Sequence, residues 1–330
     1  MIFCLPGAHY IMAILQSLKL MACLAASTAY FSVIGLAKPI DNNLPHPSAK
    51  AGAVTRAGRT ILWEWTLTRD LNDVINATAA SLEASSLITS VTNWETWRPP
   101  EIPVHIPFRP MLRTPAQLEG GDWANLLTSL SSPGTGRDKV VHFYSEPERQ
   151  GIAPAAAAEA WRQSMVPLRD WLGVKLVAPA CAADEAGTRW LDEFMDVLSA
   201  SNGNEGEDRD RQAAGHLTPD YLGLHFYGDQ RSSADEEIAA AKAYIAGRHE
   251  RHGLDVVIVE LASTSRDGAV VDRFSKEVGA WLDEQSWVLA YGLFGVERSP
   301  VNDFISPAAQ LLDAEGRWTE LGRWFTGVGP

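Results

Sequence analysis

The chain has 330 residues, and 46% of them are apolar, which is enough for one large domain with a sizeable core. A formal net charge of −13 predicts an acidic surface that repels phosphate backbones, which argues against nucleic acid as a partner. Three cysteines, Cys4, Cys23 and Cys181, are too few for a disulfide framework, so stability must come from the core.

Residues 1–37 have the pattern of a secretory signal peptide. Lys19 is followed by a long apolar stretch that ends in Gly35, Leu36 and Ala37, a small-residue pattern that favours cleavage after Ala37. The alternative is an uncleaved membrane anchor, because the apolar run is about long enough to cross a bilayer. We expect a secreted protein, extracellular or in a cell wall, that is monomeric and free of the membrane once the leader is removed.

Residues 38–58 are largely Pro, Asn, Ser, Ala and Gly without any period, so we expect a flexible lead-in. The range 59–330 is then the folded domain. Inside it, the polar stretch Asn202–Arg211 has nothing that can pack, which predicts a mobile surface loop. The sequon Asn76-Ala77-Thr78 fits a surface glycan, although chance occurrence explains it nearly as well.

Short apolar runs alternate with amphipathic segments throughout the folded range. Because the runs are continuously apolar rather than alternating, we expect strands covered on both faces, which are typical of a parallel sheet. Eight such strands interleaved with helices favour an α/β fold, the (β/α)8 TIM barrel. The expected strands are Thr60–Trp65, Leu87–Thr92, Val104–Phe108, Val140–Phe143, Lys175–Ala178, Tyr221–His225, Val256–Val259 and Val288–Leu293.

Helical periodicity fills most of the intervals between the expected strands. Thr188 and Ser233 have the residue types of helix caps, and each stands at the start of a helical segment. The expected helices are Leu71–Ala84, Gly121–Leu130, Pro154–Leu172, Thr188–Ala200, Ala234–His252, Val270–Glu284, and two short pieces at Pro307–Leu312 and Thr319–Phe325.

Two glutamates stand at the ends of expected strands. The run VVHFYSEPE reaches Glu146 just after the fourth strand, and VVIVE ends the seventh strand at Glu260. In a barrel the active site lies at the carboxyl ends of the strands, so these two carboxyls should share one mouth. A glycosidase needs one carboxyl to protonate the leaving oxygen and one to attack the sugar or activate water. We assign Glu146 the first role and Glu260 the second.

Aromatic, amide and hydroxyl side chains accompany these glutamates. Twelve tryptophans are many for this length, and several follow expected strands, where flat apolar faces could stack on sugar rings. Trp63, in contrast, is expected to pack inside the barrel. The side chains that we expect to bind substrate are Trp65, Asn93, Trp94, Trp97, Ser145, His225, Tyr227 and Phe294.

Each of these residues also has a purely structural interpretation. Glu146 could cap the following helix, and Glu260 could pair with Arg109 in a salt bridge. His225 could be a core histidine, or it could contact the substrate or hydrogen-bond to Glu260. Tyr227 could cover the rim of the barrel, although a phenol beside a nucleophile can also hold its charge.

An ordered set of motifs carries a resemblance to a known family. The segments ITSVTNWETW, VHIPFRPML, VVHFYSEPE, LGLHFYG, VIVELA and YGLFG, in this order and spacing, resemble glycoside hydrolase family 128, the fungal alkali-sensitive-linkage-protein type of glycosyl hydrolase. The resemblance covers roughly residues 60–326 and includes the closing LLDAEGRWTELGRWF.

The resemblance implies a (β/α)8 barrel that hydrolyses β-1,3-glucan with retention, in the manner of an endo-β-1,3-glucanase. Carried over by position, it gives Glu146 as the acid/base and Glu260 as the nucleophile. Ser145 and Val259 depart from the family, which usually has Asn and Thr there. A serine reaches less far than an asparagine toward the sugar's 2-hydroxyl, so we expect slow or altered hydrolysis. We also expect the negative charge of Glu260 to raise the pKa of Glu146.

A second class of function keeps the barrel but loses turnover, which would make this a β-glucan-binding protein of the cell wall. Other chemistries fit poorly. His249 and His252 lie three apart without a nearby third ligand, so we expect no metal. No phosphate-binding or dinucleotide fingerprint is present, so we expect no cofactor, and Ser145 lacks the G-x-S-x-G elbow of serine hydrolases.

Overall fold

The computed structural model describes residues 57–132, 139–200 and 216–329. The chain divides into two compact units, Met1–Ala53 and Val54–Pro330, and every described residue belongs to the second. The predicted signal peptide, most of the lead-in and the polar stretch 202–211 lie outside the described residues. Ala57 is buried and Gly58 begins the first strand, so the folded unit starts inside the range 38–58 that the sequence assigns to the lead-in.

The described strands form two parallel sheets, as expected for an α/β fold. One has the order β2 (Ile88–Thr92), β1 (Gly58–Leu62), β8 (Val288–Leu293), β7 (Val256–Ala262), β6 (Leu222–Tyr227). The other has the order β3 (Met111–Leu112), β4 (Val140–Phe143), β5 (Lys175–Val177). Isolated parallel bridges run between strand ends of the two sheets: Val91 with Phe108, Val177 with Tyr221 and Cys181 with Leu224.

The third strand differs most from its prediction. Val104–Phe108 was expected to be a strand, but Val104 is 67% exposed and the strand β3 begins only at Met111. Pro103, Pro107 and Pro110 interrupt the segment, and each lacks the N–H that a ladder requires. Although the segment is apolar, it therefore forms only one isolated bridge, at Phe108, before the two-residue strand β3.

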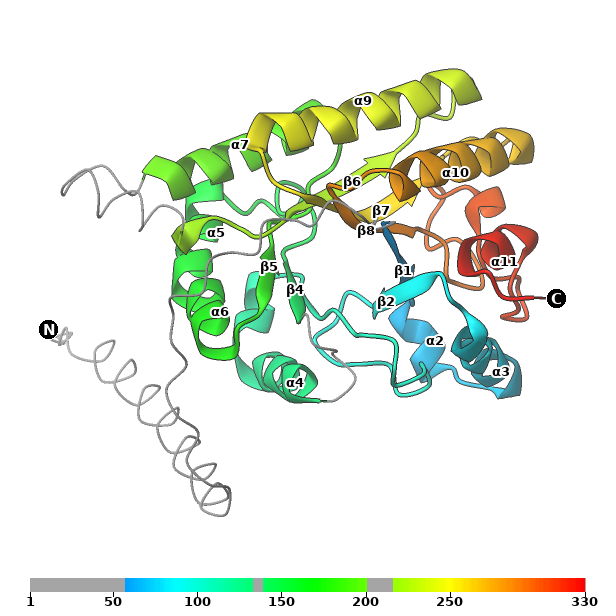
Figure 1. Ribbon diagram of the computed structural model, residues 1–330, viewed down its shortest axis with the longest axis horizontal. Coiled ribbons are helices and arrows are strands. Elements are labelled where there is room, and N and C mark those ends of the chain that lie inside the picture. Colours follow the sequence, from blue (N-terminus) through cyan, green and yellow to red (C-terminus); the bar gives the residue numbers. More distant parts are fainter. Residues whose placement is uncertain (1–56, 133–138, 201–215, 330) are drawn as a thin grey trace, which may run out of the picture. The chain divides into compact units, whose positions relative to one another are not determined.

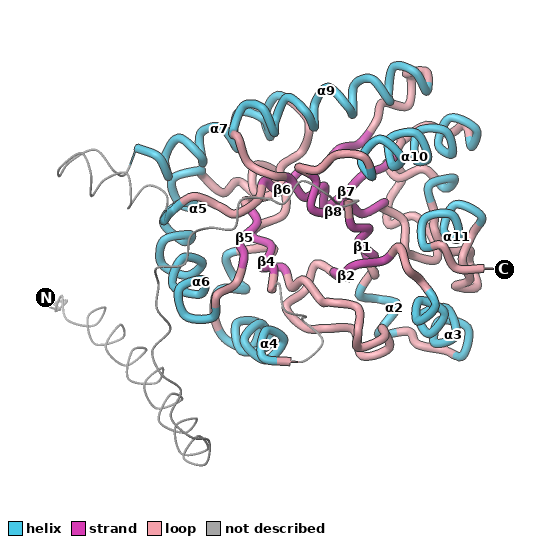
Figure 2. The backbone as a smooth tube through the Cα atoms, viewed as in Figure 1, coloured by secondary structure: helices cyan, strands magenta, loops and turns pink. Residues whose placement is uncertain are grey.

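Helices surround the strands, which gather at the centre of the unit (Figure 1, Figure 2). The longest of them, α9, begins with a capping box in which Ser233 and Glu236 satisfy each other's backbone N–H groups, so the predicted cap at Ser233 is confirmed. The helices are α2 (Trp65–Arg69), α3 (Asp73–Ser81), α4 (Gly120–Ser131), α5 (Pro154–Ala160), α6 (Val166–Leu172), α7 (Glu185–Ala200), α9 (Ala234–His252), α10 (Gly268–Asp283) and α11 (Glu320–Thr326).

Three helical predictions need correction. The expected helix Pro154–Leu172 contains a π-helical turn at Trp161–Met165 between α5 and α6, just before Pro167. Thr188 lies inside α7 rather than at its start. Trp65 belongs to α2 instead of ending the first strand, because Glu64 caps that helix by accepting a hydrogen bond from the backbone N–H of Thr66.

Arg59 in β1 connects the first strand to α10 and α11. This buried guanidinium donates to the carbonyls of Trp324 and Phe325 in α11 at 3.1 and 2.9 Å, and to the Asp283 carboxylate at 2.9 Å. It also lies 4.8 Å from the centroid of the Trp324 ring. A buried cation needs such partners, so β1, α10 and α11 depend on one another.

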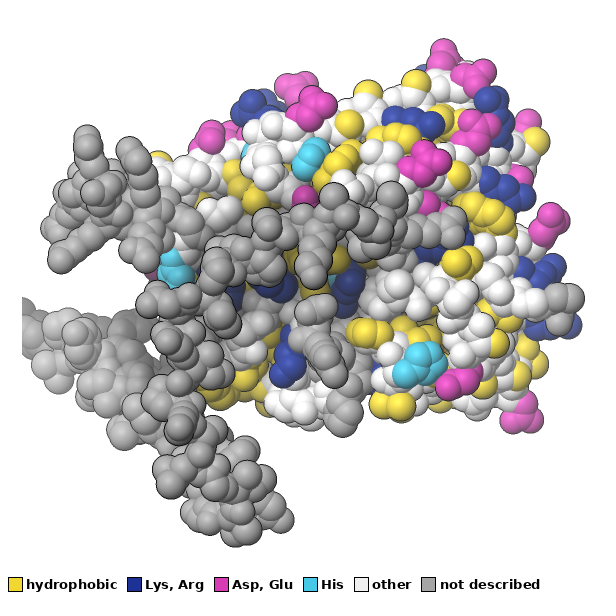
Figure 3. Space-filling model, in the orientation of Figure 1, with side chains coloured by type: hydrophobic (Ala, Val, Ile, Leu, Met, Phe, Trp, Pro, Cys, Tyr) yellow, Lys and Arg dark blue, Asp and Glu magenta, His cyan; other side chains and the backbone are white. Residues whose placement is uncertain are grey.

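On the face drawn in Figure 3, the acidic side chains of the described residues are not gathered into one patch. Acidic side chains are spread over α9 and α10, and basic side chains lie between them (Figure 3). Among the residues that the structure describes, no helix combines the length and apolarity needed to cross a membrane.

Candidate active site

Glu146 follows β4 on a backbone that bends sharply. Tyr144 and Glu146 have φ values of 48° and 45°, in the left-handed region that side chains other than glycine rarely adopt. The Glu146 N–H donates to the Ala180 carbonyl at 2.8 Å, and its own carbonyl accepts from the Arg149 N–H at 3.0 Å. The strained turn is therefore fixed on both sides, and it leaves the Glu146 side chain partly exposed, at 27%.

Glu260 lies within β7 and is held by two hydrogen bonds. The Trp94 indole N–H donates to Glu260 Oε1 at 2.7 Å, and the Tyr227 hydroxyl donates to Glu260 Oε2 at 2.5 Å. Its side chain is only 10% exposed. Phe294 packs edge-on against both donors, with ring centroids 5.6 Å from Trp94 and 5.9 Å from Tyr227. Two donors and an apolar wall keep this carboxylate in one orientation.

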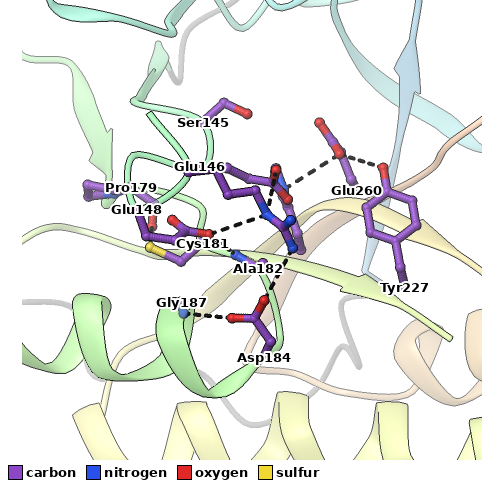
Figure 4. Close-up of polar contacts among 12 residues, drawn as sticks. Ser145, Glu146, Glu148, Pro179, Cys181, Ala182, Asp184, Gly187, Tyr227 and Glu260 are labelled. Carbon is purple, nitrogen blue, oxygen red and sulfur yellow. Dashed lines mark hydrogen bonds and ion pairs between the residues drawn. The ribbon is translucent and has the colours of Figure 1, made fainter. Parts of the chain in front are cut away.

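His225 joins the two glutamates. Its Nδ1 lies 3.3 Å from Glu146 Oε1 and 3.5 Å from Glu260 Oε2. These two carboxyl oxygens are therefore no farther apart than the sum of the two distances, about 6.8 Å. Carboxyls lie roughly 5–5.5 Å apart in retaining glycosidases and 6.5–9.5 Å apart in inverting ones. Figure 4 shows the side chains of Glu146 and Glu260 next to each other, with Tyr227 beyond Glu260.

Irregular strand pairing brings these groups together. His225 in β6 pairs with Glu260 in β7, and the register shifts just before that pair, between Leu224 and His225. A second shift occurs between Ile258 and Leu261 where β7 pairs with β8. Such irregularities turn side chains relative to the regular alternation, and they often lie beside active sites.

The charges of the site act on one another. Burial opposes the protonation of His225, but the charge of Glu260 and the hydrogen bond that His225 donates to Glu146 outweigh it, so the pKa of His225 is raised. Burial, followed by the charge of Glu260, raises the pKa of Tyr227 well above its ordinary value, so this phenol remains a donor.

Glu146 differs from the sequence-based expectation. Burial tends to raise its pKa, but the hydrogen bond and charge of His225 and the charge of Arg149 more than compensate, so the pKa of Glu146 is lowered. The expectation that the charge of Glu260 would raise it was wrong. The protonatable His225 lies between the two carboxyls and neutralises that repulsion.

Arg149 connects Glu146 to the neighbouring loop. Its Nε lies 3.2 Å from Glu146 Oε2, and its Nη2 lies 3.2 Å from Asp184 Oδ2. Asp184 is also fixed, because its Oδ1 accepts from the Gly187 N–H at 2.8 Å at the start of α7 (Figure 4). Glu148, on the same loop as Glu146, accepts a hydrogen bond from the Ala182 N–H at 2.9 Å.

Two cavities meet at Glu146 and Arg149, which line both. The larger, of about 600 Å³, also contains Glu260 and Tyr227, and its remaining wall is Ala182, Ala183, Asp184, Phe226, Gly228, Phe294, Val301, Asn302, Phe304 and Ile305. The smaller, of about 430 Å³, is lined in addition by Arg113, Thr114, Ser145 and Gln150. A cavity of the larger size accommodates a small ligand beside both carboxyls.

The residues expected to bind substrate separate into groups. Tyr227 and Phe294 line the larger cavity, and Ser145 lines the smaller one. His225 is fully buried between the glutamates. Trp94, expected as a stacking platform, instead orients Glu260 through its indole N–H, on a backbone with a φ of 58°.

The other three predicted contacts lie away from these cavities. Asn93 is fully buried, and its amide holds a turn by donating to the Trp97 carbonyl and accepting from the Glu95 N–H, so direct contact with a sugar was the wrong role for it. Trp65 lies beneath the Arg69 guanidinium, 5.0 Å from its ring centroid. Neither Trp65 nor Trp97 is among the residues that line the two cavities.

Sequence reasoning missed the Arg149–Asp184 pair and the segment Val301–Ile305. Arg149 could have been found, because it follows Glu146 by three residues. Nothing in the sequence singles out Asp184, which comes from a separate strand end. Buried Cys181 has a thiol pKa raised mainly by burial, which agrees with its interpretation as a small apolar residue.

The described residues contain no group of three or more His, Cys, Asp or Glu side chains that could hold a metal ion. His249 and His252 have other partners. His249 stacks on Trp287 and hydrogen-bonds to the Leu254 carbonyl, whereas His252 contacts Asp192.

Paired carboxyls in a cavity beside the strand ends of a parallel α/β fold are the arrangement that glycoside hydrolases use. The profile described as glycosyl hydrolase catalytic core matches residues 70–325. No curated protein matches the chain. Solved structures narrow the assignment, and the chain belongs to glycoside hydrolase family 128.

Three of these solved structures span fungal and bacterial members of that family. An exo-β-1,3-glucanase of subgroup VI from Aureobasidium namibiae is 33% identical, with a TM-score of 0.67, over 82% of this chain and 96% of that one. A subgroup IV endo-β-1,3-glucanase from Lentinula edodes is 24% identical, with a TM-score of 0.60, over 83% and 100%. A subgroup I endo-β-1,3-glucanase from Amycolatopsis mediterranei, in complex with laminarihexaose, is 18% identical, with a TM-score of 0.59, over 83% and 100%. The last two likenesses concern the fold alone.

Proposed function

We propose that this protein is a secreted, retaining hydrolase of β-1,3-glucan in which Glu146 is the acid/base and Glu260 the nucleophile. The observation that carries the proposal is the contact of both carboxyls with one His225 nitrogen, which limits their separation to about 6.8 Å. That limit is compatible with direct attack by one carboxylate while the other serves the leaving oxygen.

In the first step the Glu260 carboxylate attacks the anomeric carbon as the glycosidic bond breaks. Glu146 gives its proton to the departing oxygen, which leaves as a neutral sugar hydroxyl, and a glycosyl ester remains on Glu260. The hydrogen bonds from Trp94 and Tyr227 orient the attacking carboxylate before the reaction.

In the second step Glu146, now ionised, removes a proton from water, and the water oxygen displaces Glu260 from the anomeric carbon. The product keeps the original anomeric configuration, and both glutamates return to their starting states. His225 remains between them and balances the negative charge that moves from one to the other.

Three arguments support β-1,3-glucan as the substrate. The exo-β-1,3-glucanase from Aureobasidium namibiae is 33% identical over most of both chains. The Amycolatopsis mediterranei enzyme was solved with laminarihexaose, a β-1,3-linked glucan oligosaccharide, on the same fold. The larger cavity combines carboxylates with the aromatic rings of Tyr227 and Phe294, a mixture suited to sugar faces.

The finer points of architecture and location belong to the same proposal. A closed (β/α)8 barrel is supported by the single bridges between strand ends of the two sheets. Secretion as a monomer is supported only by the sequence of residues 1–37 and the acidic composition. N-terminal sequencing of secreted material, followed by size-exclusion chromatography, tests both: an intact leader or a dimer contradicts this part.

The decisive experiment uses a 2-deoxy-2-fluoro β-glucoside with a dinitrophenolate leaving group, which forms the ester faster than water removes it. We expect one sugar attached to Glu260 by mass spectrometry of peptides, and β-configured product from laminari-oligosaccharides by NMR. An α-configured first product, or a label on another residue, contradicts the retaining assignment.

A catalytically weak glucan-binding protein is the second candidate. It is favoured by the ion pair of Arg149 with Glu146, which weakens an acid catalyst, and by Ser145, which is shorter than the family's asparagine and reaches less far toward the sugar. Calorimetric binding of laminarihexaose without new reducing ends, unchanged in the Glu260→Gln variant, supports this candidate and contradicts the first.

A further inference from the structure

Arg149 has an arrangement that the two-glutamate mechanism does not explain. A general acid must carry a proton when the glycosidic bond breaks. Yet the Arg149 Nε lies 3.2 Å from Glu146 Oε2, the position of an ion pair, which favours the ionised carboxylate. This ion pair therefore holds the acid/base in the state that cannot begin the reaction.

Asp184 provides a second partner for the same guanidinium. The Arg149 Nη2 lies 3.2 Å from Asp184 Oδ2, while Asp184 Oδ1 is fixed by the Gly187 N–H. The Arg149 side chain is 57% exposed and that of Asp184 is 53% exposed, so both can rearrange without unpacking the core. A short movement of Arg149 toward Asp184 would release Glu146 and keep the cation paired.

The position of the pair indicates what causes the movement. Glu260 lies between Trp94 and Tyr227 on one side of the site, whereas Glu146 adjoins Arg149 on the other. The departing sugar must lie next to the carboxyl that protonates it. Arg149 and Asp184 line the larger cavity beside Glu146, so they face the hydroxyls of that sugar.

We propose that Arg149 is a positioning residue that bridges the Glu146 and Asp184 carboxylates in the free enzyme and releases Glu146, while it keeps Asp184, when the leaving-group sugar binds beside it. The inference rests on the proposed function. It assigns the Arg149–Asp184 pair as the part of the site that recognises the leaving-group unit of the glucan and makes Glu146 available as an acid.

The protons balance through solvent. When Arg149 leaves, the Glu146 carboxylate takes a proton from a solvent hydronium ion and gives it to the glycosidic oxygen as the bond to Glu260 forms. The hydrolysis of the glycosyl ester returns a proton to Glu146, which releases it to solvent when Arg149 pairs with it again. The other charged groups around Glu146 are His225 on β6, Glu260 on β7, Glu148 on its own loop, and Arg113, which lines the smaller cavity. None of these groups changes in the experiment below.

The test compares two neutral substitutions with opposite expected effects. Arg149→Gln removes the cation from Glu146, so the basic limb of the pH profile of kcat/KM should move to higher pH. Asp184→Asn removes the alternative partner and its negative charge, so the limb should move to lower pH. Asparagine can still accept from the Gly187 N–H, so the helix cap survives. The full-length protein and laminari-oligosaccharides are used.

Arg189→Gln is the matched control. Arg189 lies on α7, is 62% exposed and pairs with Glu185 at 3.7 Å, so it resembles Arg149 in exposure and pairing but lies outside the cavities. Its pH profile should match the wild-type one. If the basic limb of the pH profile stays at the same pH in both test variants, or moves in the same direction in both, Arg149 has only a structural role and the inference is overturned.

A dinitrophenyl β-glucoside separates this inference from the proposed function. Its leaving group departs without a proton, so Glu146→Gln should reduce kcat/KM for oligosaccharides at least about 100-fold more than for this substrate. Equal losses contradict the role of Glu146 itself. A third outcome is that Glu146→Gln loses activity selectively on oligosaccharides while the basic limbs of the Arg149 and Asp184 variants do not move in opposite directions. That result would support Glu146 as the acid and contradict the proposed movement of Arg149.

Discussion

The two halves of the site hold their carboxyls in opposite ways. Glu260 is 10% exposed and receives hydrogen bonds from an indole and a phenol that pack against Phe294. Glu146 is 27% exposed and contacts a guanidinium that is itself 57% exposed. The proposed nucleophile is thus oriented by buried aromatic groups, and the proposed acid/base by an exposed ion pair that can be exchanged.

The difference follows from the two tasks. A nucleophile stays ionised until it attacks, so fixed donors assist it throughout. An acid/base changes its proton twice in each cycle, and a fixed partner would favour one of its states at the expense of the other. Because the Arg149 ion pair is exposed, the guanidinium can move away from Glu146, but an exposed ion pair is also a weaker interaction.

The largest effect should come from the nucleophile side. Glu260→Gln keeps the size of the side chain and one of the two acceptor oxygens but cannot form the glycosyl ester, so kcat on laminari-oligosaccharides should fall at least roughly 10⁴-fold. Product release assayed by reducing ends checks this. A loss below about tenfold would mean that another group attacks, and the comparison between the two halves would fail.

The second prediction concerns Glu297, a buried carboxyl near Glu64 and Glu260. Burial raises its pKa from 4.5 to about 7. The folded state therefore binds a proton that the unfolded state releases, so the free energy of unfolding falls between pH 4.5 and 7, by up to about 3 kcal/mol. Glu297→Gln should remove this slope in urea titrations. The exposed Glu193→Gln should keep it, and a slope retained in Glu297→Gln would contradict the assignment.

Tyr227→Phe is the third prediction. It removes one donor to the Glu260 carboxylate and leaves the ring contacts with Phe294 in place. Because a hydrogen bond to a charged group contributes about 1.5–3 kcal/mol, kcat should fall roughly 10- to 100-fold. Tyr221→Phe, at the start of β6, is the control and should retain wild-type kcat. Equal kcat values for the two variants would show that the phenol does not orient the nucleophile.

The smallest effect should come from Ser145→Asn, which restores the residue usual in the family. Ser145 lines the smaller cavity rather than the one that holds both glutamates. We therefore expect kcat/KM on laminarihexaose to change by less than about threefold, below 1 kcal/mol. A tenfold gain in kcat/KM would mean that the side chain at position 145 contacts the sugar, and that the surroundings of Glu146 are less exposed than the cavities indicate.

Sequence periodicity predicted most elements of the fold. β8 has the predicted bounds, Val288–Leu293, and the cap at Ser233 is present, since both depend on local patterns. The segment before Met111 was misjudged because its apolar residues suggested a strand, while its prolines removed the donors. The π-helical turn at Trp161–Met165 was not predicted, although Pro167, just after it, lacks the N–H that a regular helix requires.

The candidate site was predicted in part for a similar reason. Glu146 and Glu260 stand at strand ends, where position alone indicates function. The hydrogen bond from Trp94 to Glu260 joins residues 166 positions apart, and the shifts in register around His225 set the orientations of both. The lowered pKa of Glu146 depends on His225 and Arg149 together, a three-dimensional arrangement that strand positions do not specify.

The Arg59 contacts have a consequence for how the protein is made. β1 pairs with both β2 and β8, and Arg59 is satisfied only when α10 and α11 are in place. During synthesis β1 and β2 are made close together, but the partners of Arg59 lie 224 to 266 positions later in the sequence. The contacts that bury this guanidinium are therefore distant in the sequence, and contacts of this kind slow folding because a long loop must close before they form.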